Sequence, residues 1–104
     1  MARLIWTEPA LQDLDEIAEY IALDDVGAAK RLVRKVFDAV EKLEEFPESG
    51  RRPPELKRTH YREKIVGPCR IFYRVEKDSV YILYIMRGER QLRDFILSER
   101  EKVR

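Results

Sequence analysis

The chain has 104 residues, 44% of them hydrophobic and 39% charged, with a single cysteine. This length predicts one domain, 1–104, with one hydrophobic core, and the lone cysteine excludes both an internal disulfide and a cysteine-rich zinc site. No apolar run approaches the roughly 20 residues that a membrane-spanning helix needs, so we expect a cytoplasmic protein without a membrane partner.

The charge is unevenly distributed along the chain. The formal net charge is only +1, which by itself does not indicate a nucleic-acid partner. Residues 8–25, however, carry seven acidic side chains and no basic one, whereas residues 51–104 carry fifteen basic and eight acidic ones. The sequence therefore predicts an acidic front and a basic back half, both available to partners.

The first half of the chain is predicted to form one strand and two helices. Arg3–Trp6 is rich in β-forming residues, and Thr7 can cap a helix whose apolar residues recur at spacings of three and four to about Leu23. A second apolar stripe runs over Val26–Phe46. Because the link at 24–25 is so short, we expect an antiparallel helix hairpin.

The second half is predicted to be mostly β. After a polar, proline-rich loop over 47–59 come three strand-like runs with hairpin-length links: Tyr61–Val66, Arg70–Glu76 and Ser79–Met86. Beyond a turn at 87–90, apolar residues at helical spacing predict one or two helical turns. The charged tail from Glu99 onward is expected to fray.

Together these elements predict an α+β fold. It consists of an N-terminal strand, an antiparallel helix hairpin, a three-stranded antiparallel meander and a short C-terminal helix. We expect the helix hairpin to cover one face of a four-stranded sheet, with the first strand at an edge. No internal repeat or linker divides the chain.

The sequence lacks the residues of the common catalytic sites. With His60 and Cys69 as the only histidine and cysteine, we expect neither a Ser-His-Asp triad nor a His/Cys metal site, and four scattered glycines make no phosphate loop. We therefore expect no cofactor and no metal. The carboxylates of the first helix are expected to form a solvated face, because nothing suggests a pocket that would shift their pKa values.

Basic residues gather in the loop before the second strand. Arginine suits phosphate recognition because its planar guanidinium donates two parallel hydrogen bonds and stays charged. Any single one of these arginines can be a solubilising surface residue, while the cluster can create a field that steers a polyanion. With one later arginine added, the predicted contacts to a macromolecular target are Arg51, Arg52, Arg58, Arg62 and Arg90.

Arg70 and Arg87 stand at strand ends of the predicted sheet. If both face the same side and the basic loop folds over them, the arginines form a basic cup. The alternative is that Arg70 forms an ion pair with Glu63 or Glu76. The sequence leaves these two interpretations open.

A basic cup would need proton-transfer groups to cleave RNA. Metal-free cleavage requires a base for the 2′-hydroxyl, a cation for the phosphorane and an acid for the leaving 5′-oxygen. Arg70, Arg87 and Lys57 are the candidate cations, and His60 is the candidate base or acid because its ordinary pKa lies near neutrality. A loop histidine is nevertheless more often a plain surface residue.

Several segments resemble the RelE/ParE toxin superfamily. They cover nearly the whole chain in the family order: the opening strand with 7–14, Phe46–Gly50, Val66–Val75, Val80–Ile85 and Arg87–Arg90. The resemblance implies a toxin of a type II toxin–antitoxin system. It also implies a cognate antitoxin that wraps the toxin and through which alone the pair contacts operator DNA.

The resemblance implies one of two targets. RelE-like members cut messenger RNA on the ribosome, and Arg70, Arg87 and Lys57 match positions that hold the phosphate in them. The C-terminal tyrosine or His-Tyr of those nucleases has no counterpart here, since Phe95 cannot exchange a proton. ParE-like members poison DNA gyrase, and the run 66–75 with the long hairpin is more similar to theirs.

We therefore expect a non-enzymatic toxin that binds gyrase. The alternatives are a ribosome-dependent endoribonuclease and an inactive relative that only binds its partner. The antitoxin is expected to lay an amphipathic helix beside the helix hairpin, with or without an added edge strand, and acidic residues of the first helix would match a basic antitoxin segment. The predicted antitoxin contacts are Leu11, Leu14, Leu32 and Val36.

Overall fold

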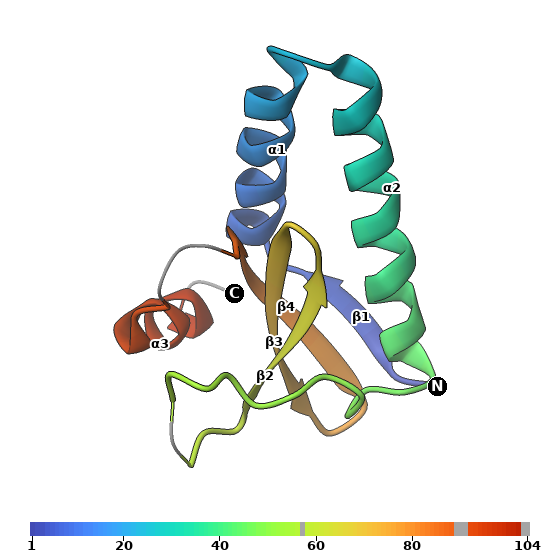
Figure 1. Cartoon of the computed structure of the whole chain (residues 1–104). Helices are drawn as coiled ribbons and strands as arrows, with labels where there is room; N and C mark the ends of the chain where they lie inside the picture. Colours follow the sequence, from blue (N-terminus) through green and yellow to red (C-terminus); the bar gives the residue numbers. More distant parts are fainter. Residues whose placement is uncertain (57, 89–91, 103–104) are drawn as a thin grey trace.

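The computed structural model describes residues 1–56, 58–88 and 92–102 (Figure 1). The elements are β1 (Arg3–Trp6), α1 (Glu8–Ala22), α2 (Val26–Glu41), the 3-10 turn η1 (Lys42–Glu44), β2 (Tyr61–Val66), β3 (Cys69–Glu76), β4 (Ser79–Arg87) and α3 (Asp94–Lys102). The predicted α+β class, with its helix hairpin and antiparallel meander, is confirmed.

The strands form one mixed sheet in the order β1-β4-β3-β2. β3 pairs antiparallel with both β2 and β4, as the short links predicted. β1 lies at the edge beside β4, to which it is parallel, from the Arg3–Ser79 pair to the Trp6–Ile82 pair. The predicted edge position of the first strand is confirmed.

The two helices of the hairpin begin at side-chain caps. The Thr7 hydroxyl accepts from the Ala10 amide at 3.4 Å, and the Asp25 carboxylate accepts from the Ala28 amide at 3.0 Å. Thr7 also donates to the carbonyl of Ile82 at 2.6 Å, which ties the start of α1 to the sheet.

No helix in the described ranges is long and apolar enough to cross a membrane.

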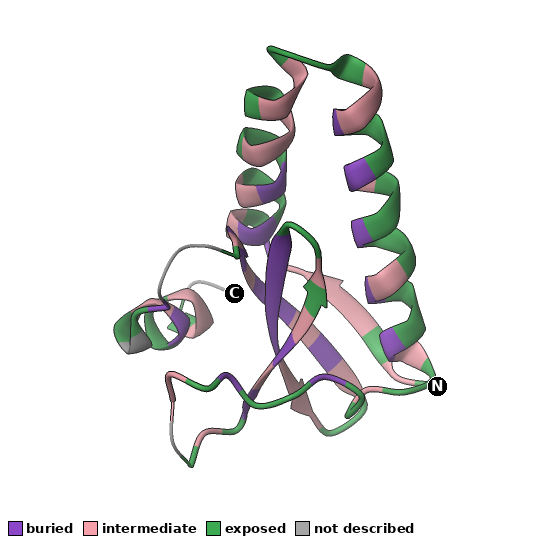
Figure 2. Ribbon diagram, in the orientation of Figure 1, coloured by how far each residue is buried: buried purple, intermediate pink, exposed green. Residues whose placement is uncertain are grey.

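The sheet separates two hydrophobic cores. Side chains alternate along β3, so Ile71 and Tyr73 pack against the helix hairpin while Phe72 packs on the opposite face with Leu97 of α3. Figure 2 shows buried residues along one side of each hairpin helix. Along β3, neighbouring residues therefore face different cores.

Two helix ends differ from the sequence-based prediction. α2 was predicted to reach Phe46 but ends at Glu41, and η1 follows, because the last residues tighten into 3-10 geometry before the proline. The C-terminal helix continues to Lys102, so the prediction of a tail that frays from Glu99 is wrong within the described residues. Contacts of Arg100 and Glu101 with the sheet hold this last turn.

Gly50 provides a test of how the loop packs on the sheet. Its amide donates to the Tyr73 hydroxyl at 2.9 Å, and a Cβ there would lie 2.5 Å from that oxygen and 2.6 Å from the Glu63 carbonyl. We expect Gly50→Ala to lower the free energy of unfolding by about 2 kcal/mol in urea denaturation, because the loop must move off the sheet.

The matched control is Gly27→Ala in the first turn of α2. A Cβ at Gly27 would lie 3.2 Å from the exposed Arg31 side chain and 3.3 Å from the capping oxygen of Asp25, and it would meet no backbone of a neighbouring segment. We expect no loss of stability for this variant. Equal effects of the two substitutions would contradict the close packing at Gly50.

Candidate functional site

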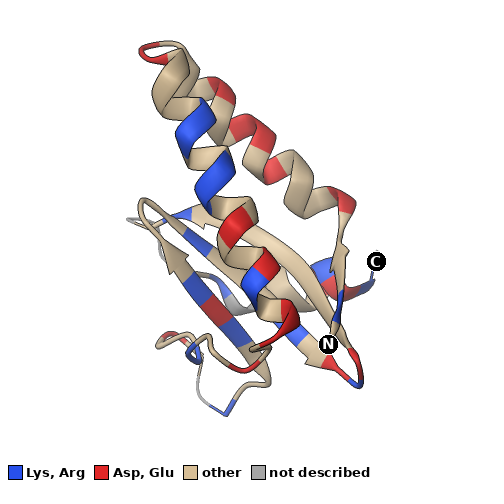
Figure 3. Cartoon of the chain, turned by 90° about the vertical axis from the view of Figure 1, so that its right-hand side faces the viewer, with Lys and Arg blue, Asp and Glu red and all other residues tan. Residues whose placement is uncertain are grey.

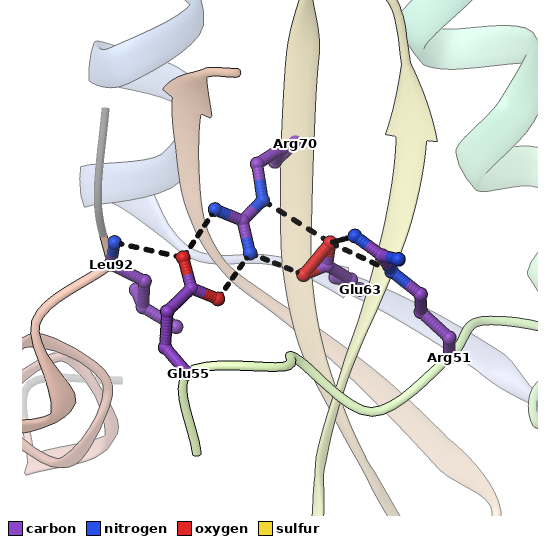
Figure 4. A network of polar contacts seen from close by, with 5 residues as sticks. All are labelled: Arg51, Glu55, Glu63, Arg70 and Leu92. Atoms are coloured by element: carbon purple, nitrogen blue, oxygen red, sulfur yellow. Dashed lines mark hydrogen bonds and ion pairs between the residues drawn. The ribbon is translucent and has the colours of Figure 1, made fainter. Parts of the chain in front are cut away.

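Arg70 lies at the centre of a buried ion-pair network (Figure 4). Its Nη1 and Nη2 each donate to one carboxylate oxygen of Glu55 at 2.7 Å, and its Nη2 donates to Glu63 Oε2 at 2.6 Å. The Glu63 side chain is fully buried and also accepts from Arg51 at 3.1 Å. Glu55 accepts from the Leu92 amide at 3.2 Å, so the network extends to the segment before α3.

Within this network, Glu55 and Arg70 hold each other in their charged forms. Hydrogen bonds from Arg70 lower the pKa of Glu55 from 4.5 to about 2, against the opposing effect of burial. The hydrogen bonds that Arg70 donates to Glu55 raise the pKa of Arg70, burial opposes this rise, and the hydrogen bonds to Glu63 add to it. The Arg70 guanidinium is therefore a charged structural centre that already holds two carboxylates, which occupy the donors that a phosphate would need.

Arg87 lies on the other face of the sheet from Arg70. Cys69 pairs with Arg87 in the β3–β4 register, and paired residues share a face, whereas the next residue, Arg70, points the opposite way. The Arg87 guanidinium stacks over the Tyr20 ring of α1, 5.4 Å from its centroid. Of the two interpretations that the sequence leaves open, the basic cup is wrong, and the ion pair of Arg70 with Glu63 is confirmed.

The arginines of the loop are anchored along it. Arg51 contacts Glu63, Arg52 donates to the Thr59 carbonyl, and Arg62 donates to the Gly50 carbonyl at 2.8 Å. Arg58 is exposed, with a positive φ of 55°. Arg51 still leaves 56% of its side chain exposed, so these contacts shape the loop and leave a basic outer surface. The predictions for Lys57 and Arg90 fall outside the described residues.

His60 lies beside the C-terminal helix. Its Nε2 is 3.5 Å from Glu101, a carboxylate that also accepts hydrogen bonds from Tyr61 and Arg74. Burial raises the pKa of Glu101, but the hydrogen bonds from Tyr61, His60 and Arg74 outweigh it, so the pKa is lowered. His60 therefore contributes to the attachment of α3 to β2 and β3.

The residues predicted to contact an antitoxin are mostly in the core. Leu14, Leu32 and Val36 are at most 5% exposed, whereas Leu11 is 41% exposed. The main apolar stripe of each helix packs against the sheet, which hides it from a partner. The assignment of Leu14, Leu32 and Val36 to a partner surface is therefore corrected.

The hairpin instead presents a groove on its outer side. This groove of about 580 Å³ is lined by Ala18, Glu19, Ala22, Val26, Ala29, Lys30, Val33, Arg34, Phe37 and Asp38. Its floor is made of small and apolar side chains, and its volume suits an inserted side-chain row. Its signal in the sequence is the set of alanines Ala18, Ala22 and Ala29, which lie beside the larger apolar residues of each helix.

The two rims of the groove carry different charges. Figure 3 shows acidic residues along α1 and basic residues in the first half of α2. Glu19 lies on the α1 rim, whereas Lys30, Arg34 and Asp38 lie on the α2 rim, where two basic residues and one acidic residue leave a net positive charge. A helix placed in the groove therefore meets negative charge on one side and positive charge on the other.

Comparison with known proteins agrees with this architecture. The model of the ParE toxin of the type II toxin–antitoxin system parDE matches residues 4–92. This chain belongs to the ParE toxin family. It is a toxin of a type II toxin–antitoxin system, and the ParDE pairing of that family implies an antitoxin partner.

Individual relatives of this ParE-family toxin are similar over most of their length. A Sinorhizobium fredii protein named as a candidate toxin, Y4kP, is 44% identical over 91 residues, which cover 86% of this chain and 91% of that protein. Toxin RelE2 of Caulobacter vibrioides is 35% identical over 91 residues, or 86% of this chain and 99% of that protein. A structure of the chromosomal ParDE system from P. aeruginosa superposes with a TM-score of 0.71 at 29% identity, covering 86% and 98% of the two chains.

The network around Arg70 gives a stability prediction for this ParE-family toxin. Arg70→Met leaves the buried Glu63 carboxylate without its main partner, so we expect a loss of about 3 kcal/mol in the free energy of unfolding. Adding Glu63→Leu removes the stranded charge and is expected to recover at least part of that loss in chemical denaturation.

The control is Arg52→Met, which removes an exposed guanidinium and is expected to change stability by less than about 0.5 kcal/mol. If Arg70 served only to bind phosphate, its substitution would not lower the free energy of unfolding. In that case Arg70→Met would be as stable as Arg52→Met.

Proposed function

We propose that this toxin acts in the cytoplasm by binding DNA gyrase and stabilising its cleaved-DNA intermediate, without bond-making chemistry of its own. A ligand shifts an equilibrium only as far as its affinities for the two states differ. The toxin would therefore bind the broken-strand state of gyrase more tightly than the resealed state. Its membership of the ParE family supports gyrase as the target.

The separation of Arg70 from Arg87 is the observation that carries this proposal over RNA cleavage. The nuclease hypothesis needs both guanidinium groups on one phosphate. Here the sheet lies between them, since Arg70 binds Glu55 and Glu63 on one face and Arg87 stacks on Tyr20 on the other. An RNA phosphate would have to displace two carboxylates from Arg70, one of them fully buried.

The outer groove of the helix hairpin is the proposed site for the antitoxin. An amphipathic helix can place apolar side chains on the alanine-rich floor and charged ones toward the rims. Complementarity to Glu19 on one rim and to Lys30 and Arg34 on the other sets its expected charge pattern. Basic residues would face α1 and acidic residues would face α2.

Purified toxin added to gyrase and supercoiled plasmid should increase the amount of cleaved DNA trapped by detergent and protease. The reason is that tighter binding to the broken state raises its population. Translation in a cell-free extract serves as the counter-assay. Unchanged gyrase cleavage together with arrested translation and cut messenger would reverse the assignment in favour of the ribosome.

Ala22→Tyr tests the groove, because the added ring fills its floor from α1. We expect the antitoxin encoded beside the toxin gene to bind this variant at least ~10-fold more weakly in calorimetry, equivalent to about 1.4 kcal/mol. Gln12→Tyr, at an exposed position of α1 outside the groove, is the matched control. Equal affinity of both variants for the antitoxin would remove the groove from the interface.

A further inference from the structure

β4 extends beyond the strand that covers its edge. β1 pairs with β4 only as far as Ile82, where the chain turns into α1, whereas β4 continues to Arg87. Along this extension, side chains from α1 and α3 form hydrogen bonds with the β4 backbone in place of a neighbouring strand. The Ile85 amide donates to Asp13 at 3.0 Å, and the Leu83 carbonyl accepts from Arg100 at 3.1 Å.

Arg100 is bound at this edge by three different kinds of contact. Its Nη1 and Nη2 donate to the two carboxylate oxygens of Asp13 at 2.9 and 3.0 Å. Its Nη1 also reaches the Leu83 carbonyl, and its guanidinium stacks over the Tyr84 ring, 4.9 Å from the centroid. These three groups suit a guanidinium. The carboxylate accepts its two parallel N–H bonds, the carbonyl accepts a further N–H, and the aromatic ring stacks on its flat face.

Asp13 is a largely buried carboxylate whose charged form depends on a cationic partner. Burial raises its pKa, and hydrogen bonds from Arg100 and the Ile85 amide offset this only in part. The expectation that every acidic residue of α1 faces bulk solvent is thus wrong for Asp13. Its side chain is 14% exposed, and the Arg100 side chain is 23% exposed, so the pair is accessible at its margin.

The helix that delivers Arg100 is short. α3 has nine residues, a length at which an isolated helix is unstable in water, so its position depends on its contacts with the sheet. Leu97 is its buried apolar anchor, and Arg100 and Glu101 bind opposite margins of the sheet. Loss of the Arg100 contacts would leave Leu97 and Glu101 as the main anchors of α3.

A cavity continues along the β4 edge from this point. It has a volume of about 400 Å³ and is lined by Asp13, Glu16, Ile17, Tyr20, Tyr84, Ile85, Met86 and Arg87. Two carboxylates and one guanidinium line it, and residues 8–25 as a whole carry seven acidic side chains and no basic one. The surroundings therefore favour a segment that carries positive charge at the Asp13 end.

We propose that Asp13, the Leu83 carbonyl and Tyr84 form a guanidinium-binding site on the open edge of β4, which Arg100 fills in the free toxin and an arginine of the antitoxin fills in the complex. The antitoxin arginine would belong to an extended segment lying in the cavity along β4. The identity of this partner rests on the proposed antitoxin pairing, whereas the guanidinium site itself does not.

The exchange has a consequence for binding strength. Arg100 competes with the antitoxin arginine, so the apparent affinity equals the intrinsic affinity multiplied by the fraction of toxin molecules in which the site is vacant. Replacing Arg100 would release the last turn of α3 from β4. The antitoxin would then both fill the edge and loosen α3 from the sheet.

The site is tested first without any antitoxin. In Arg100→Gln the site is vacated, and ethylguanidinium at millimolar concentration should shift the NMR signal of the Ile85 amide in a saturable way. Ethylammonium, which lacks the planar fork, should shift it far less. The double variant Asp13→Asn/Arg100→Gln should show no saturable response. Equal responses to the two cations, or no response in Arg100→Gln, would overturn the guanidinium site.

The exchange is tested with the purified product of the reading frame adjoining the toxin gene. We expect Arg100→Gln to bind this antitoxin at least ~3-fold more tightly than the unmodified toxin, because the internal competitor is gone. Arg93→Gln, an exposed arginine just before α3, is the charge-matched control and should leave the affinity unchanged. Asp13→Asn/Arg100→Gln should lose the gain.

Unchanged or weaker antitoxin binding by Arg100→Gln would overturn the exchange. Arg100→Lys guards against a folding defect, since it keeps the charge without the fork and should bind the antitoxin with intermediate affinity. Failure of the neighbouring protein to bind the unmodified toxin would overturn the antitoxin pairing and the exchange together. The ethylguanidinium result would still decide the site.

Discussion

The buried pairing of Arg70 with Glu63 and Glu55 is the interaction on which the second face of this molecule depends. It joins β3 to β2 and to the loop before β2, and through the Leu92 amide it reaches the start of the C-terminal segment. Burying a carboxylate is costly unless a charged partner stays beside it. Glu63 is fully buried. If Arg70 left it for a ligand, the fold would lose stability, because an unpaired charge would remain in the interior.

This constraint makes Arg70 part of the internal framework of the fold. Arg70 forms ion pairs inside the fold. Arg51 and Arg62 contact the loop and β2 and hold the segment that covers the second core. Arg87 and Arg100, by contrast, lie at the open edge of β4 and contact aromatic rings of α1 and β4. The candidate sites for partners therefore lie at the edge of the sheet and in the outer groove of the hairpin, and not at the centre of the sheet.

The C-terminal helix links these two regions. Consecutive residues Arg100 and Glu101 reach opposite margins of the sheet, one to Asp13 on α1 and the other to Arg74 and Tyr61 on β3 and β2. A short helix held mainly by side-chain contacts is sensitive to competition for any one of them. We therefore expect binding at the β4 edge to be coupled to the packing of the second core through α3.

The sequence by itself determined the order and type of the elements. Periodicities of two and 3.6, the caps at Thr7 and Asp25 and the hairpin-length links are local features, and they sufficed for the α+β class, the edge strand and the meander. Local rules also identified which arginines were unusual, because Arg70 and Arg87 stood at strand ends.

Only the tertiary structure decided which of these residues meet. The β3–β4 register places Cys69 opposite Arg87 and so puts Arg70 on the other face, and a shift of one residue would have reversed this. Likewise, Leu14 and Val36 became core residues because the hairpin settled with that stripe against the sheet. Asp13 meets Arg100 across 87 residues of chain, a contact that packing creates and that no local pattern encodes.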